Sequence, residues 1–229
     1  MPRPRIRRDS GFTLVEMLVV MGVFGLLMVI TFTILLQFMF QAQDAQARAL
    51  ALQDMRLGVS QIDRQVRSGN VIRDPATEVA GVAGISVGPF YSMRIFTQEG
   101  GEPRCAQWRV IDHDDDGFGD LEFRSWDPGY PGVLDVDDWG AVAHNIVDVG
   151  VHPTSTSQID RNDPATWPPF WVDTAVGSRT QAQFVRITLR LKAPGQREDT
   201  KPVSVTTVVT GRNTIFGYPS STCGVVPPA

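Results

Sequence analysis

The sequence predicts an α+β protein, in which a long N-terminal helix packs on an antiparallel β-sheet head. Two observations support this prediction. Between Phe12 and Asp74 there is no proline, and the pattern is apolar at first and amphipathic afterwards. After Val71 the hydrophobic period changes to two, which is typical of strands with one buried face.

The first forty residues have the composition of a membrane helix with a basic flank. The leader Met1 to Gly11 holds Arg3, Arg5, Arg7 and Arg8 against a single acid, Asp9. From Phe12 to Phe40 the only charged side chain is Glu16. As a helix this run would span about 43 Å, more than the ~30 Å hydrocarbon core of a bilayer. The basic flank predicts that the leader stays in the cytoplasm.

Two ordinary interpretations of this segment fit less well. A secretory signal peptide with a cleavage site near Ala45-Gln46-Ala47 would have an apolar run about half as long. A plain single-pass anchor fits the length, but Glu16 deep in the bilayer would cost roughly 2.5 to 3.5 kcal/mol. Its presence therefore indicates a partner for the carboxylate.

The run Gly11-Phe12-Thr13-Leu14-Val15-Glu16 resembles the start of type IV pilin and pseudopilin precursors. The resemblance covers about thirty residues. It implies that a prepilin peptidase cuts between Gly11 and Phe12, and that the new α-amine of Phe12 is methylated. It also implies that Glu16 pairs with the N-terminal amine of a neighbouring subunit and so sets the register of assembly.

The same resemblance implies the domain organisation and the function. Residues 1–11 form a cleaved leader, 12–40 the transmembrane half of the helix, 41–68 its amphipathic half, and 69–229 a β-rich head. The chain is then a minor pilin or pseudopilin of a type IV pilus, a competence pseudopilus or a type II secretion pseudopilus. The pattern of its Trp108–Ile111 and Leu121–Arg124 hairpin is similar to J-type minor pseudopilins and W-type minor pilins.

Partners and location follow from that resemblance. The expected partners are prepilin peptidase, other minor and major pilins or pseudopilins, the inner-membrane assembly platform and the membrane itself. The expected location is the inner or cytoplasmic membrane, crossed once, with the head outside the cytoplasm and the subunit built into a filament. Because the head is large for a subunit repeated thousands of times, a minor role is expected.

The helix is expected to continue from the apolar run to about Ser68. A narrow apolar stripe recurs at spacings of three and four residues, which predicts the face that packs on the head. It consists of Leu52, Met55, Val59, Ile62 and Val66. Ser68-Gly69-Asn70 is the predicted stop, since Gly and Asn readily adopt the left-handed cap conformation. Gly22, Gly25 and Gly58 are candidates for close approaches of the helix to another element or for local softening of the helix.

Six segments of the head are predicted to be strands. They are rich in β-branched and aromatic residues, and comprise Ser92 to Thr97, Ala106 to Asp112, Leu121 to Trp126, Val142 to Val151, Gln183 to Lys192 and Val203 to Thr210. The clearest alternation runs from Phe184 to Lys192, where apolar residues point one way and Arg, Thr and Lys the other. Pro194 to Lys201 is the predicted hairpin loop between the last two strands.

The two cysteines, Cys105 and Cys223, predict a disulfide if the head lies in an oxidising compartment. Two free buried thiols are the alternative. Three histidines at unrelated positions do not complete a zinc site with the cysteines.

The run from Asp112 to Asp120 could be a solvated turn or a calcium loop. Asp112, Asp114 and Asp116 lie at alternate positions before Gly117, and Asp120 follows it, as in loops that bind calcium. The bidentate Glu expected at the twelfth position is Phe123 here, however, and Asp-Gly is common in hairpin turns. The turn is the preferred interpretation, with calcium as the only cofactor considered.

The long segment Thr154 to Thr180 contains Trp167-Pro168-Pro169-Phe170-Trp171. If exposed, these aromatic residues could form a partner surface, and the alternative function is then an adhesive or glycan-binding tip protein on a pilin stem. If buried, they form a lid over the sheet of the protein itself.

Charge and motifs exclude several other functions. The formal charge of −4 falls to −7 once a leader with four arginines and one aspartate is removed, which argues against a nucleic-acid partner. No phosphate-binding loop or zinc-protease motif occurs, and neither cysteine has a convincing catalytic partner, so the chain is not expected to be an enzyme.

Overall fold

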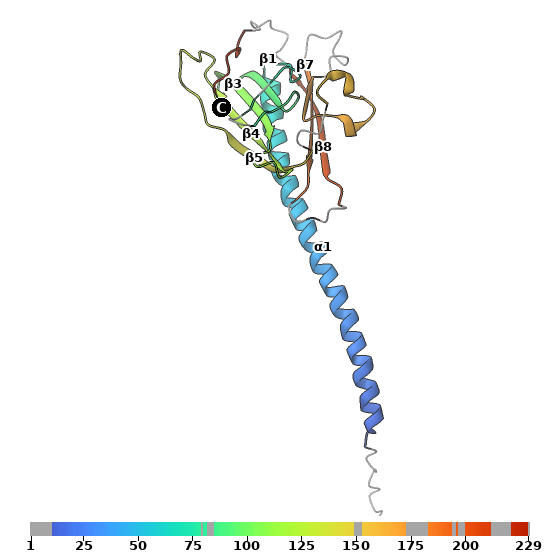
Figure 1. Ribbon diagram of the computed structural model, residues 1–229. Coiled ribbons are helices and arrows are strands. Elements are labelled where there is room, and N and C mark those ends of the chain that lie inside the picture. Colours follow the sequence, from blue (N-terminus) through green and yellow to red (C-terminus); the bar gives the residue numbers. More distant parts are fainter. Residues whose placement is uncertain are drawn as a thin grey trace, which may run out of the picture. The chain divides into compact units, whose positions relative to one another are not determined.

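The computed structural model describes residues 11–78, 80–81, 85–148, 153–172, 183–193, 196, 200–211 and 221–228. The chain divides into two units, Met1–Gln46 and Ala47–Ala229. Helix α1 (Leu14–Ser68) contributes residues to both. Its 55 residues match the predicted long helix, although it begins two residues after Phe12. The arrangement is α+β, as predicted: one long helix and an antiparallel sheet (Figure 1).

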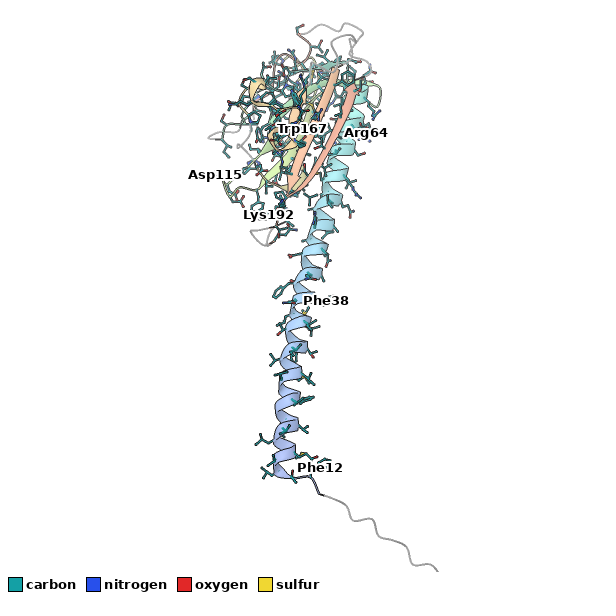
Figure 2. All side chains as sticks on the ribbon, turned by 90° about the vertical axis from the view of Figure 1, so that its right-hand side faces the viewer. Phe12, Phe38, Arg64, Asp115, Trp167 and Lys192 are labelled. Carbon is teal, nitrogen blue, oxygen red and sulfur yellow. A yellow bond between two sulfur atoms is a disulfide. The ribbon has the colours of Figure 1, made fainter. Side chains whose placement is uncertain are left out.

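In the first unit, the apolar half of α1 presents its side chains outward on every side. All residues from Gly11 to Phe40 are exposed, and Figure 2 shows the labelled side chains of Phe12 and Phe38 pointing away from the helix. By length and composition, α1 can cross a membrane. A helix that is apolar all round and has no protein packed on it is suited to lipid or to neighbouring apolar helices.

In the second unit, α1 buries one face against the sheet. Met55, Ile62 and Val66 are fully buried, while Leu52 and Val59 of the predicted stripe are partly buried. Gly58 is also buried, and a Cβ added there would lie 2.9 Å from Leu121 Cδ2. The predicted close approach is therefore present at Gly58, whereas a Cβ added at Gly22 or Gly25 would meet nothing within 4 Å among the described residues.

The helix stops at Ser68, as predicted, but for a different physical reason. Neither Gly69 nor Asn70 is among the described residues with positive φ. Instead, a Cβ at Gly69 would lie 2.8 Å from Ile95 Cγ2 and 3.1 Å from the Val66 carbonyl oxygen. Glycine is needed here because β2 passes close to the end of the helix.

The strands form one antiparallel sheet in the order β1-β2-β3-β4-β5-β7-β6, with β8 paired to β7. They are β1 (Val71–Ile72), β2 (Ser92–Glu99), β3 (Glu102–Ile111), β4 (Gly119–Trp126), β5 (Gly140–Ile146), β6 (Phe170–Val172), β7 (Gln183–Leu191) and β8 (Val203–Gly211). Two short 3₁₀ helices, η1 (Thr156–Gln158) and η2 (Pro164–Thr166), precede β6.

All six predicted strands are present, with shifted ends. β5 stops at Ile146 instead of Val151, and residues 149–151 lie outside the described part of the chain. Most of the predicted loop from Pro194 to Lys201 also lies outside it. β1 and β6 were not predicted, because segments of two and three residues are too short to show a period.

The core lies between α1 and one face of the sheet. In β7, Val185, Ile187, Leu189 and Leu191 are buried as the alternation predicts. They pack with Met55 and Ile62 of α1 and with residues of β2, β3 and β4, including Met93, Ile95, Trp108, Val110 and Leu121. Tight burial of so many apolar side chains is the main favourable contribution to folding of this unit.

The residues on the opposite face of β2, β3 and β4 are also buried, although six of the nine are polar. The register of β2, β3 and β4 places them in three rows: Ser92, Arg109 and Glu122; Arg94, Gln107 and Arg124; Phe96, Cys105 and Trp126. All nine side chains are buried. This face is therefore covered by other parts of the chain instead of facing solvent.

Candidate functional site

The N-terminal candidate site is the short segment that leads into α1. Thr13 caps the helix: its Oγ1 accepts a hydrogen bond from the Glu16 backbone NH at 3.3 Å, and its carbonyl accepts from the Met17 NH at 3.2 Å. Thr-x-x-Glu is the sequence of a capping box, in which a hydroxyl satisfies an NH of the first turn. Gly11 and Phe12 therefore precede the helix.

Gly11 and Phe12 are accessible. A Cβ added to Gly11 would meet nothing within 4 Å, so none of the described residues makes a contact that requires glycine there. The Phe12 side chain is 78% exposed. A non-helical, accessible peptide bond is the form in which proteases bind their substrates, so this junction can enter an active site without unwinding α1.

Glu16 lies in the first turn of α1. In the described part of the chain, no hydrogen bond or ion pair engages its carboxylate, while its backbone NH donates to Thr13 Oγ1. The positive end of the helix dipole favours a carboxylate at this position. An amine at Phe12 would stand four residues before this carboxylate.

Comparison with known families gives one match, to the prokaryotic N-terminal methylation motif, over residues 6–32. The chain carries the N-terminal motif of type IV pilins and pseudopilins. This family consists of structural subunits that are generally not enzymes, and its motif implies processing by prepilin peptidase and assembly with other pilins. No curated protein and no solved structure matches the chain.

The match and the structure together support a pilin-like or pseudopilin subunit. The exposed apolar helix and the motif fit anchoring in a membrane. The matched residues end at position 32, within α1, so the family motif says nothing about the head. The second unit, Ala47–Ala229, lies entirely outside the matched residues.

The Asp-rich loop of the pilin-like chain joins β3 and β4. Carboxylate oxygens of Asp112, Asp114 and Asp116 lie within 4.8 Å of one another. Asp120 is not in this group; its Oδ1 lies 2.8 Å from His144 Nδ1. Of the four predicted calcium ligands, the structure thus brings three together.

The loop's own amides already satisfy Asp112. Its Oδ1 accepts from the Asp115 NH at 2.9 Å, and its Oδ2 accepts from the Gly117 NH at 2.9 Å. Asp115 and Gly117 have φ values of 60° and 87°, as tight turns require. Burial tends to raise the pKa of Asp112, but NH donation from Gly117, Asp115 and Asp114 outweighs it and holds the pKa below its usual value. These hydrogen bonds explain the shape of the loop as a turn without a bound cation.

Cys105 of β3 and Cys223 form a disulfide that joins residues 118 positions apart. The sulfur atoms lie among Phe96, Trp126 and the partly buried Tyr130. The disulfide fixes the segment Ser221–Pro228, which we call the tail, to the polar face of the sheet.

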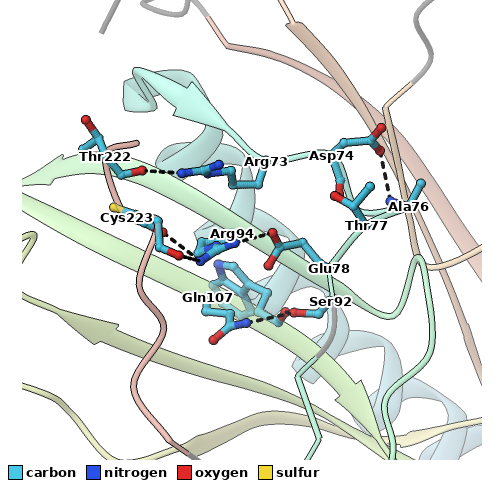
Figure 3. Close-up of polar contacts among 12 residues, drawn as sticks. Arg73, Asp74, Ala76, Thr77, Glu78, Ser92, Arg94, Gln107, Thr222 and Cys223 are labelled. Atoms are coloured by element: carbon cyan, nitrogen blue, oxygen red, sulfur yellow. Dashed lines mark hydrogen bonds and ion pairs between the residues drawn. The ribbon is translucent and has the colours of Figure 1, made fainter. Parts of the chain in front are cut away.

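Arginines hold the tail to the polar face, mostly through its carbonyl oxygens. Arg94 donates to the Cys223 carbonyl at 2.7 Å and to Glu78 Oε1 at 2.6 Å (Figure 3). Arg73 donates to the Thr222 carbonyl at 3.0 Å. Arg124 donates to the Pro227 and Pro228 carbonyls, each at 2.9 Å.

Arg109 and Arg124 also belong to the buried polar residues on this face of the sheet, which we call the polar layer. Arg109 is paired with Glu122 at 2.6 Å, and burial nevertheless lowers its pKa from the usual value. Burial, helped by the charges of Arg109 and Arg94, lowers the pKa of Arg124 to about 10. Both guanidinium groups stack on the Trp139 ring, at 3.8 Å and 4.4 Å. Sequence patterns did not reveal this layer, since buried and solvated arginines look alike in an alternating strand.

The segment with Trp167 to Trp171 lies on the protein's own sheet. Phe170 is fully buried and Trp171 is 3% exposed. Arg186 of β7 stacks on Trp167 at 3.9 Å, and Arg190 donates to the Trp167 carbonyl at 3.2 Å. The lid interpretation therefore fits, and these residues do not offer the exposed aromatic surface that an adhesive tip would need.

Proposed function

We propose that the chain is a minor pilin or pseudopilin, a non-enzymatic assembly subunit of a type IV pilus, a competence pseudopilus or a type II secretion pseudopilus. The observation that carries the proposal is the N-terminal motif with its capped, accessible junction at the start of an exposed apolar helix. The large head, stabilised by a disulfide and a buried polar layer, favours a subunit used in few copies.

In this proposal the chain has four functional parts. Residues 1–11 are a leader that prepilin peptidase removes, 12–40 span the membrane once, 41–68 pack on the head, and 69–229 form the head outside the cytoplasm. Hydrolysis of the Gly11–Phe12 peptide bond gives Phe12 a free α-amine, which a methyltransferase then methylates. The leader's basic residues would hold the precursor's N-terminus in the cytoplasm until cleavage.

Glu16 is the proposed assembly residue. A carboxylate in an apolar helix is costly when unpaired and much less so when it meets a cation. The α-amine of a neighbouring subunit's mature N-terminus would supply that cation at the same depth in the membrane. Correct register is then rewarded, because a shifted neighbour would leave the Glu16 carboxylate without its partner.

The test is co-purification of Glu16→Leu with other pilin-like subunits from membranes, at matched expression. The variant should insert at least as well as the native chain, since it removes a desolvation cost. It should recover far fewer partner subunits. Gln37→Leu, another polar-to-apolar change in the same apolar run, is the matched control and should assemble normally. Equal recovery with Glu16→Leu would contradict an assembly role for the charge.

A further inference from the structure

Strand β8 leaves one long edge of the sheet unpaired. It pairs with β7 over nine residues, from Gln183↔Gly211 to Leu191↔Val203, with no shift of register. On the other side of β8, no hydrogen bond reaches the backbone from Val203 to Thr210 within the described residues. About every second residue from Val203 to Thr210 in β8, labelled in Figure 1, therefore directs a free NH and C=O group to the outer edge, while the residues between them bond β7.

The sequence of this edge lacks the usual protection against strand pairing. From Val203 to Thr210 there is no charge and no proline, and seven of the eight residues are β-branched. Natural edge strands are usually short, charged or interrupted by bulges. The two end strands of the sheet follow that rule, because β1 has two residues and β6 has three.

The two faces of β8 differ. Val205 packs against the core and Val209 is buried, so one face is used within the head. On the other face Ser204 and Thr206 are exposed and Val208 is 50% exposed. A strand lying beside β8 would therefore meet small, uncharged side chains on this face.

We propose that the β8 edge binds an extended strand of a neighbouring, different pilin-like subunit by β-augmentation. Main-chain donors and acceptors at strand spacing are matched by another extended peptide and by little else. The proposal rests on the proposed function, which places such subunits beside this one in the membrane. Pairing of β8 with β8 of a second copy would be isologous and would close the contact as a dimer, whereas a filament needs contacts that continue.

The first test places a charge on the edge. Thr206 faces Thr188 across the β7–β8 pair, so lysine there adds a charge without a like charge directly opposite. Thr206→Lys in the full chain should lower recovery of pilin-like partners about tenfold, the effect of losing about 1.4 kcal/mol of pairing energy. Thr206→Val keeps an uncharged edge and should behave like wild type. Gln98→Lys adds the same charge on β2 and should also behave like wild type.

The second test measures amide hydrogen exchange in β8. Between Val203 and Thr210, the amides that point to the outer edge should become more protected in the membrane-extracted assembly than in the isolated full chain in detergent, whereas those that bond β7 should change little. Equal exchange in the two states would overturn the proposal, as would a cross-link from this edge to a second copy of the chain.

The two proposals can fail separately. If wild type and Thr206→Lys recover pilin-like partners equally while Glu16→Leu does not, the edge proposal is wrong and the proposed function stands. If wild type recovers no pilin-like partner, both are wrong.

Discussion

Trp108 and Gln65 are joined by a buried hydrogen bond in which the indole Nε1 donates to Gln65 Oε1 at 2.6 Å. Gln65 lies near the C-terminal end of α1 and Trp108 lies in β3, so this bond joins the helix to the centre of the sheet. Both residues are buried, at 6% and 0% exposure. The polar group at this otherwise apolar contact fixes the rotation of α1 against the strands.

Gln65→Leu should therefore destabilise the head. The variant leaves the Trp108 NH buried without an acceptor, which costs about 1 to 3 kcal/mol. Thermal unfolding of the detergent-extracted full chain is the measurement. Gln53→Leu, on the exposed side of the same helix, is the control and should change stability little. Equal melting temperatures for the two variants would mean that the bond contributes nothing.

The mature chain should begin at Phe12. Intact-mass analysis of membrane-extracted protein should show loss of Met1 to Gly11, with or without one added methyl group. Gly11→Leu should accumulate as the precursor, whereas Gly22→Ala, a glycine change inside the helix, should be processed normally. An N-terminus at Arg48 would indicate an ordinary signal peptide and would contradict the proposed function.

Cys223→Ser should lower the stability of the head. On the chain-entropy account, a disulfide that closes a loop of this length stabilises by about 4 to 5 kcal/mol at most. The tail then loses its disulfide to β3 and depends on its hydrogen bonds with Arg73, Arg94 and Arg124. Limited proteolysis should cut the tail faster in Cys223→Ser than in Ser221→Ala, which keeps the disulfide. Two alkylatable thiols in the native exported protein would rule out this role.

Calcium should have little effect on the head. Because backbone NH groups already satisfy Asp112, a chelator should leave the melting temperature nearly unchanged, and added calcium should restore nothing. Asp114→Asn with Asp116→Asn should show the same indifference. A rise of several degrees with calcium that the double variant abolishes would establish the calcium interpretation instead.

Asp112 should make the head less stable in acid. Its pKa in the folded chain is lower than the ordinary value of 3.8. Its contribution is thus complete above that ordinary value and is lost as the pH falls through the lower, folded value. Asp112→Asn should be less stable than wild type near pH 7, and the difference should shrink below about pH 4. A constant difference across acid pH would exclude Asp112 as its source.

The sequence was sufficient to predict α1 and the long strands because their periods are local. Met55, Ile62 and Val66 repeat with the helical period, and β7 alternates over nine residues. The predicted start of the helix, Phe12, is two residues too early, because the apolar pattern continues through the cap at Thr13. Thr13 and Glu16 have the spacing of a capping box, which is the local signal for the true start. The stop at Gly69 was placed correctly, but its cause is a tertiary contact with Ile95 that no local pattern contains.

The polar layer could not be predicted for a related reason. Alternation predicts which residues share a face, and Arg94, Gln107 and Arg124 do share one. Whether that face meets water depends on segments that return from far along the chain, here Glu78 and the tail. Contacts between distant segments leave no period in the sequence, so the predicted half-buried sheet is covered on both faces in this region.

The tail has a further consequence for how the chain could vary during evolution. Arg73, Arg94 and Arg124 bind it through main-chain oxygens, and Pro227 and Pro228 carry no NH that would need an acceptor. Apart from Cys223, side chains in the tail could therefore change widely while the arginine contacts persist. Sequence identity would then underestimate how far relatives share this feature, and buried arginines on β2 and β4 would be its better marker.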